Sequence, residues 1–150
     1  MKTPLNVSLD AMGGDHGAEV VVPGADLAAT RHPEVHFHLY GDQAKINPLL
    51  EVTRQLKHRC TVHHTDVSVS MDDKPSQALR RGRGKSSMWQ AVSAVADGTA
   101  AAAVSAGNTG ALMATARFVL KTVPGIDRPA ILARIPSKTG HTHMLDLGAN

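Results

Sequence analysis

Short apolar segments alternate with longer segments of helical spacing, and this alternation constrains the fold of the chain most strongly. LNVSLD (residues 5–10) and VHFHLYG (residues 35–41) have the length and the apolar content of β-strands. Between them lies AEVVVPGADLAATR (residues 18–31), which has the apolar spacing of an α-helix. Strands that alternate with helices favour an α/β fold in which helices cover a mostly parallel sheet.

The alternation continues along the sequence. We predict helices at residues 18–31, 42–56, 86–98 and 109–123, and strands at residues 5–10, 35–41, 60–66, 101–107, 130–136 and 142–150. Pro23 is tolerated in a first helical turn, which favours a start of the first helix near Val21. A short turn joins the last two strands, so these are expected to form an antiparallel hairpin. The polar, basic segment after the third strand is expected to form a long loop of the kind that is often functional.

Composition and charge fit one ordinary globular domain. The chain has 150 residues, of which 42% are hydrophobic and 19% are charged. A net charge of +3 is too small for a nucleic-acid-binding arm and fits an acidic partner or an anionic substrate. The single cysteine, Cys60, excludes an internal disulfide and indicates a reducing cytoplasm. We find neither the apolar core of a signal peptide nor a stretch long enough for a transmembrane helix.

Three polar corners that contain glycine follow predicted strands: DAMGGDHG, SAGNTGA and DLGAN. In α/β sheets, ligands bind beyond the carboxyl ends of the strands, so we expect these corners to form the site. In SAGNTGA, Gly107 and Gly110 allow a tight turn and a close approach to a ligand, and Asn108 or Thr109 can cap the following helix. The N–H groups of its first turn suit an anion such as phosphate. A capped helix that simply packs against a strand would give the same local pattern.

The first corner and the basic segment are open to similar alternatives. Asp10, Asp15 and His16 could transfer protons, or they could hydrogen-bond the turn. The corner is not G-x-G-x-x-G, which argues against a dinucleotide-binding module. The basic residues of RRGRGK could form a solvated loop, or they could dock on an acidic surface or hold a phosphate; they are Arg80, Arg81, Arg83 and Lys85.

The remaining reactive residue types favour neither a metal nor a catalytic nucleophile. The nine histidines lack the ligand spacing of zinc sites, so we predict no metal and no cofactor. Cys60 has no evident base and is expected to be a buried structural thiol. The sequence also lacks the G-x-S-x-G elbow of serine hydrolases.

Five motifs occur in an order that is typical of one family: VSLDAMGGDHG, DDKPSQALRR…SSM, VSAGNTGALMA, GIDRPAI and LDLGAN. From Val7 to Asn150 the sequence resembles the acyl-carrier-protein:phosphate acyltransferases of bacterial lipid synthesis, the PlsX family. The resemblance implies a three-layer α/β/α sandwich like that of isocitrate dehydrogenases and phosphate acetyltransferases. Family members are roughly twice as long, beyond a typical single domain. We therefore expect residues 1–150 to form a single α/β domain, the N-terminal part of a longer fold.

The resemblance also implies an activity and partners. The family transfers a long-chain fatty acyl group from acyl carrier protein to inorganic phosphate, and a membrane glycerol-3-phosphate acyltransferase uses the acyl phosphate. Its members form homodimers and associate peripherally with the membrane. Two alternatives stay open: acyl-CoA as the donor, or a truncated, non-catalytic domain that binds carrier protein.

Because phosphate is itself the nucleophile, this chemistry needs anion-binding backbone and stabilisation of an oxyanion rather than a catalytic Ser or Cys. We expect the phosphate site to consist of Ser105, Gly107, Asn108, Thr109 and Gly110. The catalytic candidates are Asn108, Thr109, Asp10 and His16, with Asp15, Asp146 and Asn150 around the same cleft. The basic residues from Arg80 to Lys85 are expected to meet the acidic carrier protein.

Overall fold

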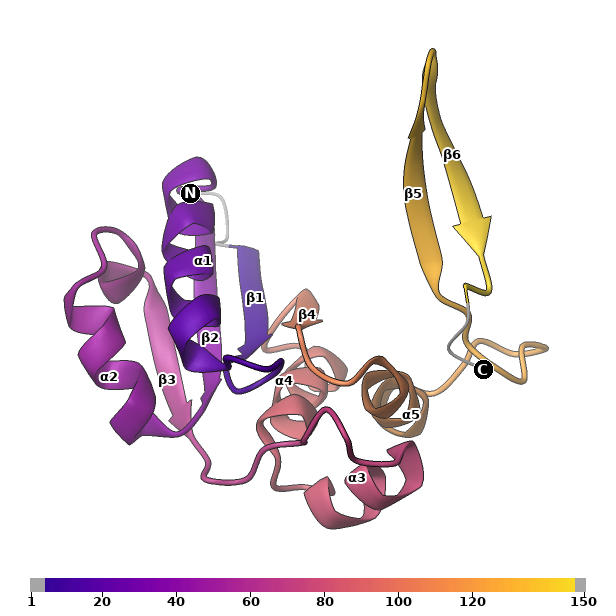
Figure 1. Ribbon diagram of the computed structural model, residues 1–150, viewed down its shortest axis with the longest axis horizontal. Helices are drawn as coiled ribbons and strands as arrows, with labels where there is room; N and C mark the ends of the chain where they lie inside the picture. Colours follow the sequence, from indigo (N-terminus) through magenta and orange to yellow (C-terminus); the bar gives the residue numbers. More distant parts are fainter. Residues whose placement is uncertain (1–4, 148–150) are drawn as a thin grey trace.

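A computed structural model of the chain describes residues 5–147 (Figure 1). In chain order its elements are β1 (Leu5–Asp10), α1 (Ala18–Arg31), β2 (Val35–Gly41), α2 (Gln43–Glu51), the 3₁₀ turn η1 (Leu56–His58), β3 (Cys60–His64), α3 (Pro75–Gly82), α4 (Ser87–Ala96), β4 (Ala102–Ser105), α5 (Thr109–Leu120), β5 (Leu132–Ser137) and β6 (Gly140–Leu145).

Four strands form a parallel sheet in the order β3-β2-β1-β4. Alternate side chains of β1 and β2, among them Leu9, Phe37 and Leu39, form a buried core with α1 and α2 on one face of the sheet. On the opposite face α4 packs, and the Ser8 hydroxyl donates to the Ala91 carbonyl at 2.7 Å. The predicted three-layer α/β/α arrangement is therefore confirmed.

The first helix starts earlier than predicted. α1 begins at Ala18, so the expected start near Val21 is wrong. Gly17 has a φ of 49°, and its carbonyl accepts hydrogen bonds from the N–H groups of Val20 (3.2 Å) and Val21 (3.0 Å). The glycine thus turns the chain into the helix before Pro23 is reached, and Pro23 lies exposed inside it.

Contacts distant in the sequence correct two further boundaries. The helix predicted over residues 42–56 ends at Glu51, because the backbone N–H groups of residues 54–56 bond to the carboxylate of Asp26 on α1. The segment predicted as a long loop contains α3, with Pro75 in its first turn. Ala78 of this helix is buried against Met88 and Ala111, so packing against α4 and α5 stabilises a segment with little apolar character of its own.

The predicted hairpin is confirmed as the antiparallel pair β5–β6. It forms a two-stranded sheet of its own and projects away from the parallel sheet, beyond α5 (Figure 1). Apolar side chains on it are open to solvent, including Leu132 (58% exposed) and Leu145 (63% exposed).

Candidate functional site

The first two glycine corners meet where β1 and β4 end. Asp10 and Ser105 are paired in the parallel register, so the chain leaves both strands at the same edge of the sheet. A Cβ atom on Gly13 would lie 2.8 Å from the backbone N of Gly107 and 2.8 Å from Oδ2 of Asp10. The corners therefore touch only because position 13 lacks a side chain, and their predicted convergence is confirmed.

A buried carboxylate joins these corners. The Ser105 hydroxyl donates to Oδ2 of Asp10 at 2.7 Å, and the Met12 N–H donates to Oδ1 at 3.3 Å. Oγ of Ser105 in turn accepts the N–H of Gly107 at 3.1 Å. Asp10 is only 2% exposed, so this geometry gives Asp10 and Ser105 a positioning role beneath the site.

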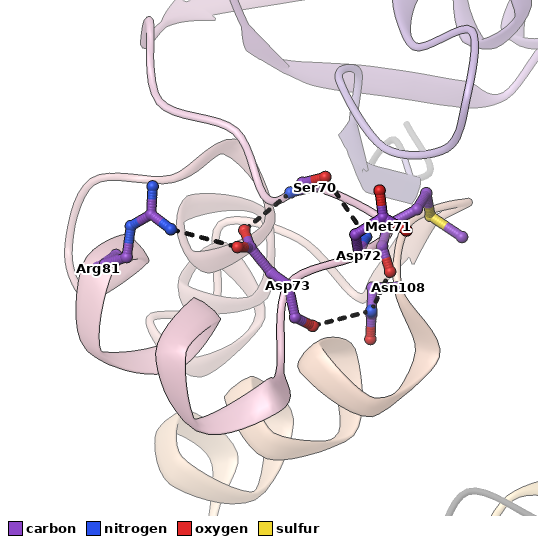
Figure 2. Close-up of polar contacts among 6 residues, drawn as sticks. All are labelled: Ser70, Met71, Asp72, Asp73, Arg81 and Asn108. Atoms are coloured by element: carbon purple, nitrogen blue, oxygen red, sulfur yellow. Dashed lines mark hydrogen bonds and ion pairs between the residues drawn. The ribbon is translucent and has the colours of Figure 1, made fainter.

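Asn108 connects the start of α5 to the segment of residues 70–73 (Figure 2). Its Oδ1 caps the helix by accepting the N–H of Ala111 at 2.9 Å. Its amide Nδ2 donates to the carbonyls of Met71 (2.7 Å) and Asp73 (3.2 Å). The side-chain amide is thus fully used within the protein, and the donors at this corner that can face an anion are backbone N–H groups of the first turn, those of Thr109 and Gly110.

Asp73 organises the same segment and was not identified from the sequence. Its Oδ2 accepts the N–H of Ser70 at 3.1 Å, and its Oδ1 pairs with the Arg81 guanidinium at 3.2 Å (Figure 2). Its position just before Lys74 and Pro75 is a turn signal that could have revealed it. Arg81, which is predicted to dock a partner, also has the carboxylate of Asp73 beside it.

A small hollow runs along α5 from Gly110 to Arg117. It has a volume of about 180 Å³, and its walls include Gly110 and Met113 of α5 together with Pro75 and Pro129. Arg117 and Arg128 also line it, and no acidic side chain among residues 5–147 does. Arg117 lies in the last turn of α5, so these two guanidinium groups favour an anion in the hollow along the helix rather than at its first turn.

The first corner borders two other hollows. One, of about 440 Å³, lies against residues 68–73 and is lined by Asp15, Asp72, Asp73 and Arg81, an acidic set. The other, of about 430 Å³, lies against α2, where His16 and Asp15 share it with Glu19 and Lys45. The structure therefore places His16 on the α2 side of the corner, whereas the arginine-lined hollow is on the α5 side.

The described part of the third corner, Asp146 and Leu147, follows a hairpin that forms a sheet of its own. Asp146 follows β6 with a φ of 63°, and its N–H donates to the Ile131 carbonyl at 3.0 Å. Figure 1 shows the end of β6 beyond α5, far from the end of β1. Asn150 lies outside the described residues.

The basic residues lie on and after α3. Arg80 and Arg81 are in its last turn, Arg83 follows it, and Lys85 lies in the connection to α4. All four are exposed. Cys60 is half-buried, and burial raises the pKa of its thiol, which disfavours the thiolate, as expected for a structural cysteine.

The described residues also bear on two other classes of site, a membrane span and a metal centre. Between residues 5 and 147, no helix has both the length and the apolar character needed to cross a membrane. In that same part of the chain, no three His, Cys, Asp or Glu side chains converge as metal ligands.

Comparison with known proteins gives one consistent result. The profile of a family described as "Fatty acid synthesis protein" matches residues 5–150. A phosphate acyltransferase of Parvibaculum lavamentivorans is 56% identical over 149 residues, which cover 99% of this chain and 41% of the relative. Phosphate acyltransferases of Azorhizobium caulinodans and Rhodopseudomonas palustris (strain BisA53) are 57% and 60% identical over 150 residues, covering 100% of this chain and 42% and 43% of the relatives. The chain spans about two fifths of the length of these curated relatives.

Proposed function

Because the chain belongs to the fatty acid synthesis protein family, we propose that it takes part in the transfer of a fatty acyl group to inorganic phosphate. The family match confirms the resemblance of the five sequence motifs, and the relatives named above are phosphate acyltransferases. The acyl donor in this proposal is a long-chain thioester of acyl carrier protein, and the product is acyl phosphate for phospholipid synthesis.

The start of α5 supports this proposal most directly. Phosphate is held by the backbone N–H groups of Thr109 and Gly110, and Arg117 and Arg128, which line the hollow along α5, add positive potential over a longer range. Asn108 holds this turn in place through its bonds to Ala111 and to residues 71 and 73. Asp10 and Ser105 hold the neighbouring corner against it.

The reaction needs positioning more than covalent catalysis. A phosphate oxygen attacks the thioester carbonyl carbon, and the carbonyl oxygen takes up negative charge as the C–O bond forms. The C–S bond then breaks, the electron pair leaves with sulfur, and the thiolate takes up a proton. N–H groups fixed before the reaction stabilise such an oxyanion at little reorganisation cost. His16 lies in the hollow on the α2 side of the first corner, so this proposal assigns the proton to solvent rather than to its imidazole.

A substitution to proline tests the backbone donors. Thr109 is the first residue of α5, a position where proline is well tolerated, and Asn108 has φ −55° and ψ 116°, which a residue before proline can adopt. Thr109→Pro therefore removes one N–H group and keeps the helix. Thr109→Ala removes the side chain and keeps the N–H group, which makes it the matched control.

We expect Thr109→Pro to weaken phosphate binding, measured by calorimetry on the purified chain, by about tenfold or more, the value of one hydrogen bond to a charged group. Thr109→Ala is expected to bind like the parent chain. Equal affinity of the proline variant and the parent would contradict the proposed site.

Turnover separates the possible donors. Acyl phosphate trapped with hydroxylamine is expected from acyl-carrier-protein thioester and not from acyl-CoA; the opposite preference would favour acyl-CoA as donor. Carrier-protein binding without product would favour a non-catalytic binding domain. Homodimer formation, a cytoplasmic location at the inner membrane face and delivery to a membrane glycerol-3-phosphate acyltransferase belong to the same proposal.

A further inference from the structure

Positive charge is concentrated on one helical layer of the protein. Residues 74–121, which include α3, α4 and α5, contain seven of the sixteen Lys and Arg residues but only one of the thirteen acidic residues, Asp97. The rest of the chain has an excess of acidic residues, so this layer accounts for the whole positive net charge. α5 packs against both α3 and α4, and Figure 1 shows the three helices gathered on one side of β4.

An aromatic ring lies between two of these cations. The Arg83 guanidinium carbon is 4.6 Å from the ring centroid of Phe118, and Nζ of Lys121 is 4.8 Å from it. The ring of Trp89 lies 5.5 Å from the same ring, centroid to centroid. Both cations are within the range of cation–π attraction, so the ring holds them in place before any partner arrives. We name these four residues the Phe118 cluster.

The Phe118 cluster is available to a partner. Phe118 is 37% exposed, and Arg83 and Lys121 are exposed as well. Within residues 5–147 neither cation forms an ion pair, whereas Arg81 on the same layer is paired with Asp73. The cluster therefore presents two uncompensated charges around a partly exposed aromatic ring.

We propose that the Phe118 cluster is the docking centre for an acidic protein surface. Aromatic residues and arginine are the side chains that most often dominate protein–protein binding, and a layer with a large excess of positive charge complements carboxylates on a partner. This inference rests on the proposed function, in which a protein carries the acyl group. It extends the basic segment around Arg80 to residues of α4 and α5.

Charge reversal tests the surface. The probe is purified acyl carrier protein, and the readout is calorimetry together with the emission of Trp89, the single tryptophan of the chain, which lies in the cluster. We expect Arg83→Glu combined with Lys121→Glu to weaken binding by about tenfold or more. The matched control is Arg31→Glu with Lys57→Glu, which makes the same charge change at exposed sites in α1 and η1 and is expected to bind like the parent chain.

Three results would overturn the proposal. The cluster variant could bind carrier protein like the parent chain, or the control could lose as much affinity as the cluster variant. The chain could also fail to bind carrier protein and instead bind vesicles of phosphatidylglycerol and phosphatidylcholine through Arg83 and Lys121, which would assign the surface to lipid. Circular dichroism and thermal unfolding verify that each variant is folded.

The binding and turnover assays test the docking surface and the proposed function independently. If the chain binds carrier protein through the Phe118 cluster but forms no acyl phosphate, the proposed function is refuted and the docking surface is supported. Acyl phosphate formation with unaltered carrier-protein affinity in the cluster variant supports the function and refutes the surface.

Discussion

Removal of the Ser105 hydroxyl tests whether the buried carboxylate of Asp10 holds the two corners together. In the parent protein this hydroxyl donates to Asp10 at 2.7 Å and accepts the N–H of Gly107 at 3.1 Å. Ser105→Ala therefore deprives a carboxylate that is 2% exposed of a donor, and a backbone N–H of its acceptor. No other side chain is displaced, because the substitution only deletes one oxygen atom.

The expected cost follows from these two bonds. A hydrogen bond to a charged group contributes about 1.5–3 kcal/mol, so we expect Ser105→Ala to lower the free energy of unfolding by about 2–3 kcal/mol. For a chain of this size the unfolding temperature should fall by about 4–12 °C. Urea unfolding followed by circular dichroism measures the change. Ser76→Ala, at an exposed site in α3, is the control and is expected to change stability by less than about 0.5 kcal/mol.

A double-mutant cycle with Asp10→Ala isolates the pair. Since the two side chains are in direct contact, we expect a coupling energy of about 1 kcal/mol or more. A Ser105→Ala variant as stable as the control, or additive effects of the two substitutions, would refute the role given to this pair.

Three further predictions concern the frame around the site. Burial, followed by the proximity of His63 and His36, lowers the pKa of His38 below its ordinary value of 6.5, and burial also lowers the pKa of His63, so the folded state favours neutral imidazoles. The free energy of unfolding should therefore be highest above pH 6.5 and fall as the pH drops below it. Urea unfolding at pH 8 and pH 5.5 measures this, and an equal midpoint at both pH values would contradict it. The Asp26 carboxylate accepts the backbone N–H groups of residues 54–56, so Asp26→Asn should lower the free energy of unfolding by about 1–3 kcal/mol and speed hydrogen exchange at these residues. Unaltered exchange there would argue against this role of Asp26. Gly110→Ala places a Cβ atom 2.8 Å from Cγ of Pro75 and should lower the unfolding free energy by about 1–3 kcal/mol, although alanine is the better helix former; a stabilised variant would show that α3 can move away freely.

The local sequence pattern was sufficient to predict those elements whose bounds are set by their own residues. β1 and β2 have the predicted bounds, because the length and the apolar spacing of these two segments are those of a strand in a buried sheet. Asn108 caps α5, as its place before a helical segment predicts, since the capping bond reaches only three residues ahead. The meeting of the first two glycine corners was also predictable, because parallel strands end at the same edge.

Contacts between distant residues decided the rest of the site. The link from Asn108 to residues 71 and 73 spans more than thirty positions and has no signature in either segment. Asp10 and Ser105 were predicted as parts of a cleft, and their burial as a bonded pair emerged only when β1 and β4 lay side by side. His16 belongs to a similar polar corner, yet it lines the hollow against α2 rather than the one along α5. Asp146 comes directly after β6, and this strand stands beyond α5 (Figure 1).

By itself, the sequence determined the layered α/β fold, the family and the polar corner before α5, because periodicity, capping and turn chemistry are local properties. Tertiary structure alone decided where α2 ends, that α3 is a helix, that β5 and β6 stand apart, and that Arg83 and Lys121 share the ring of Phe118. The physical reason is the same in each case: a carboxylate, a packing surface or an aromatic ring supplied by a distant segment outweighs the weak preference of the local residues.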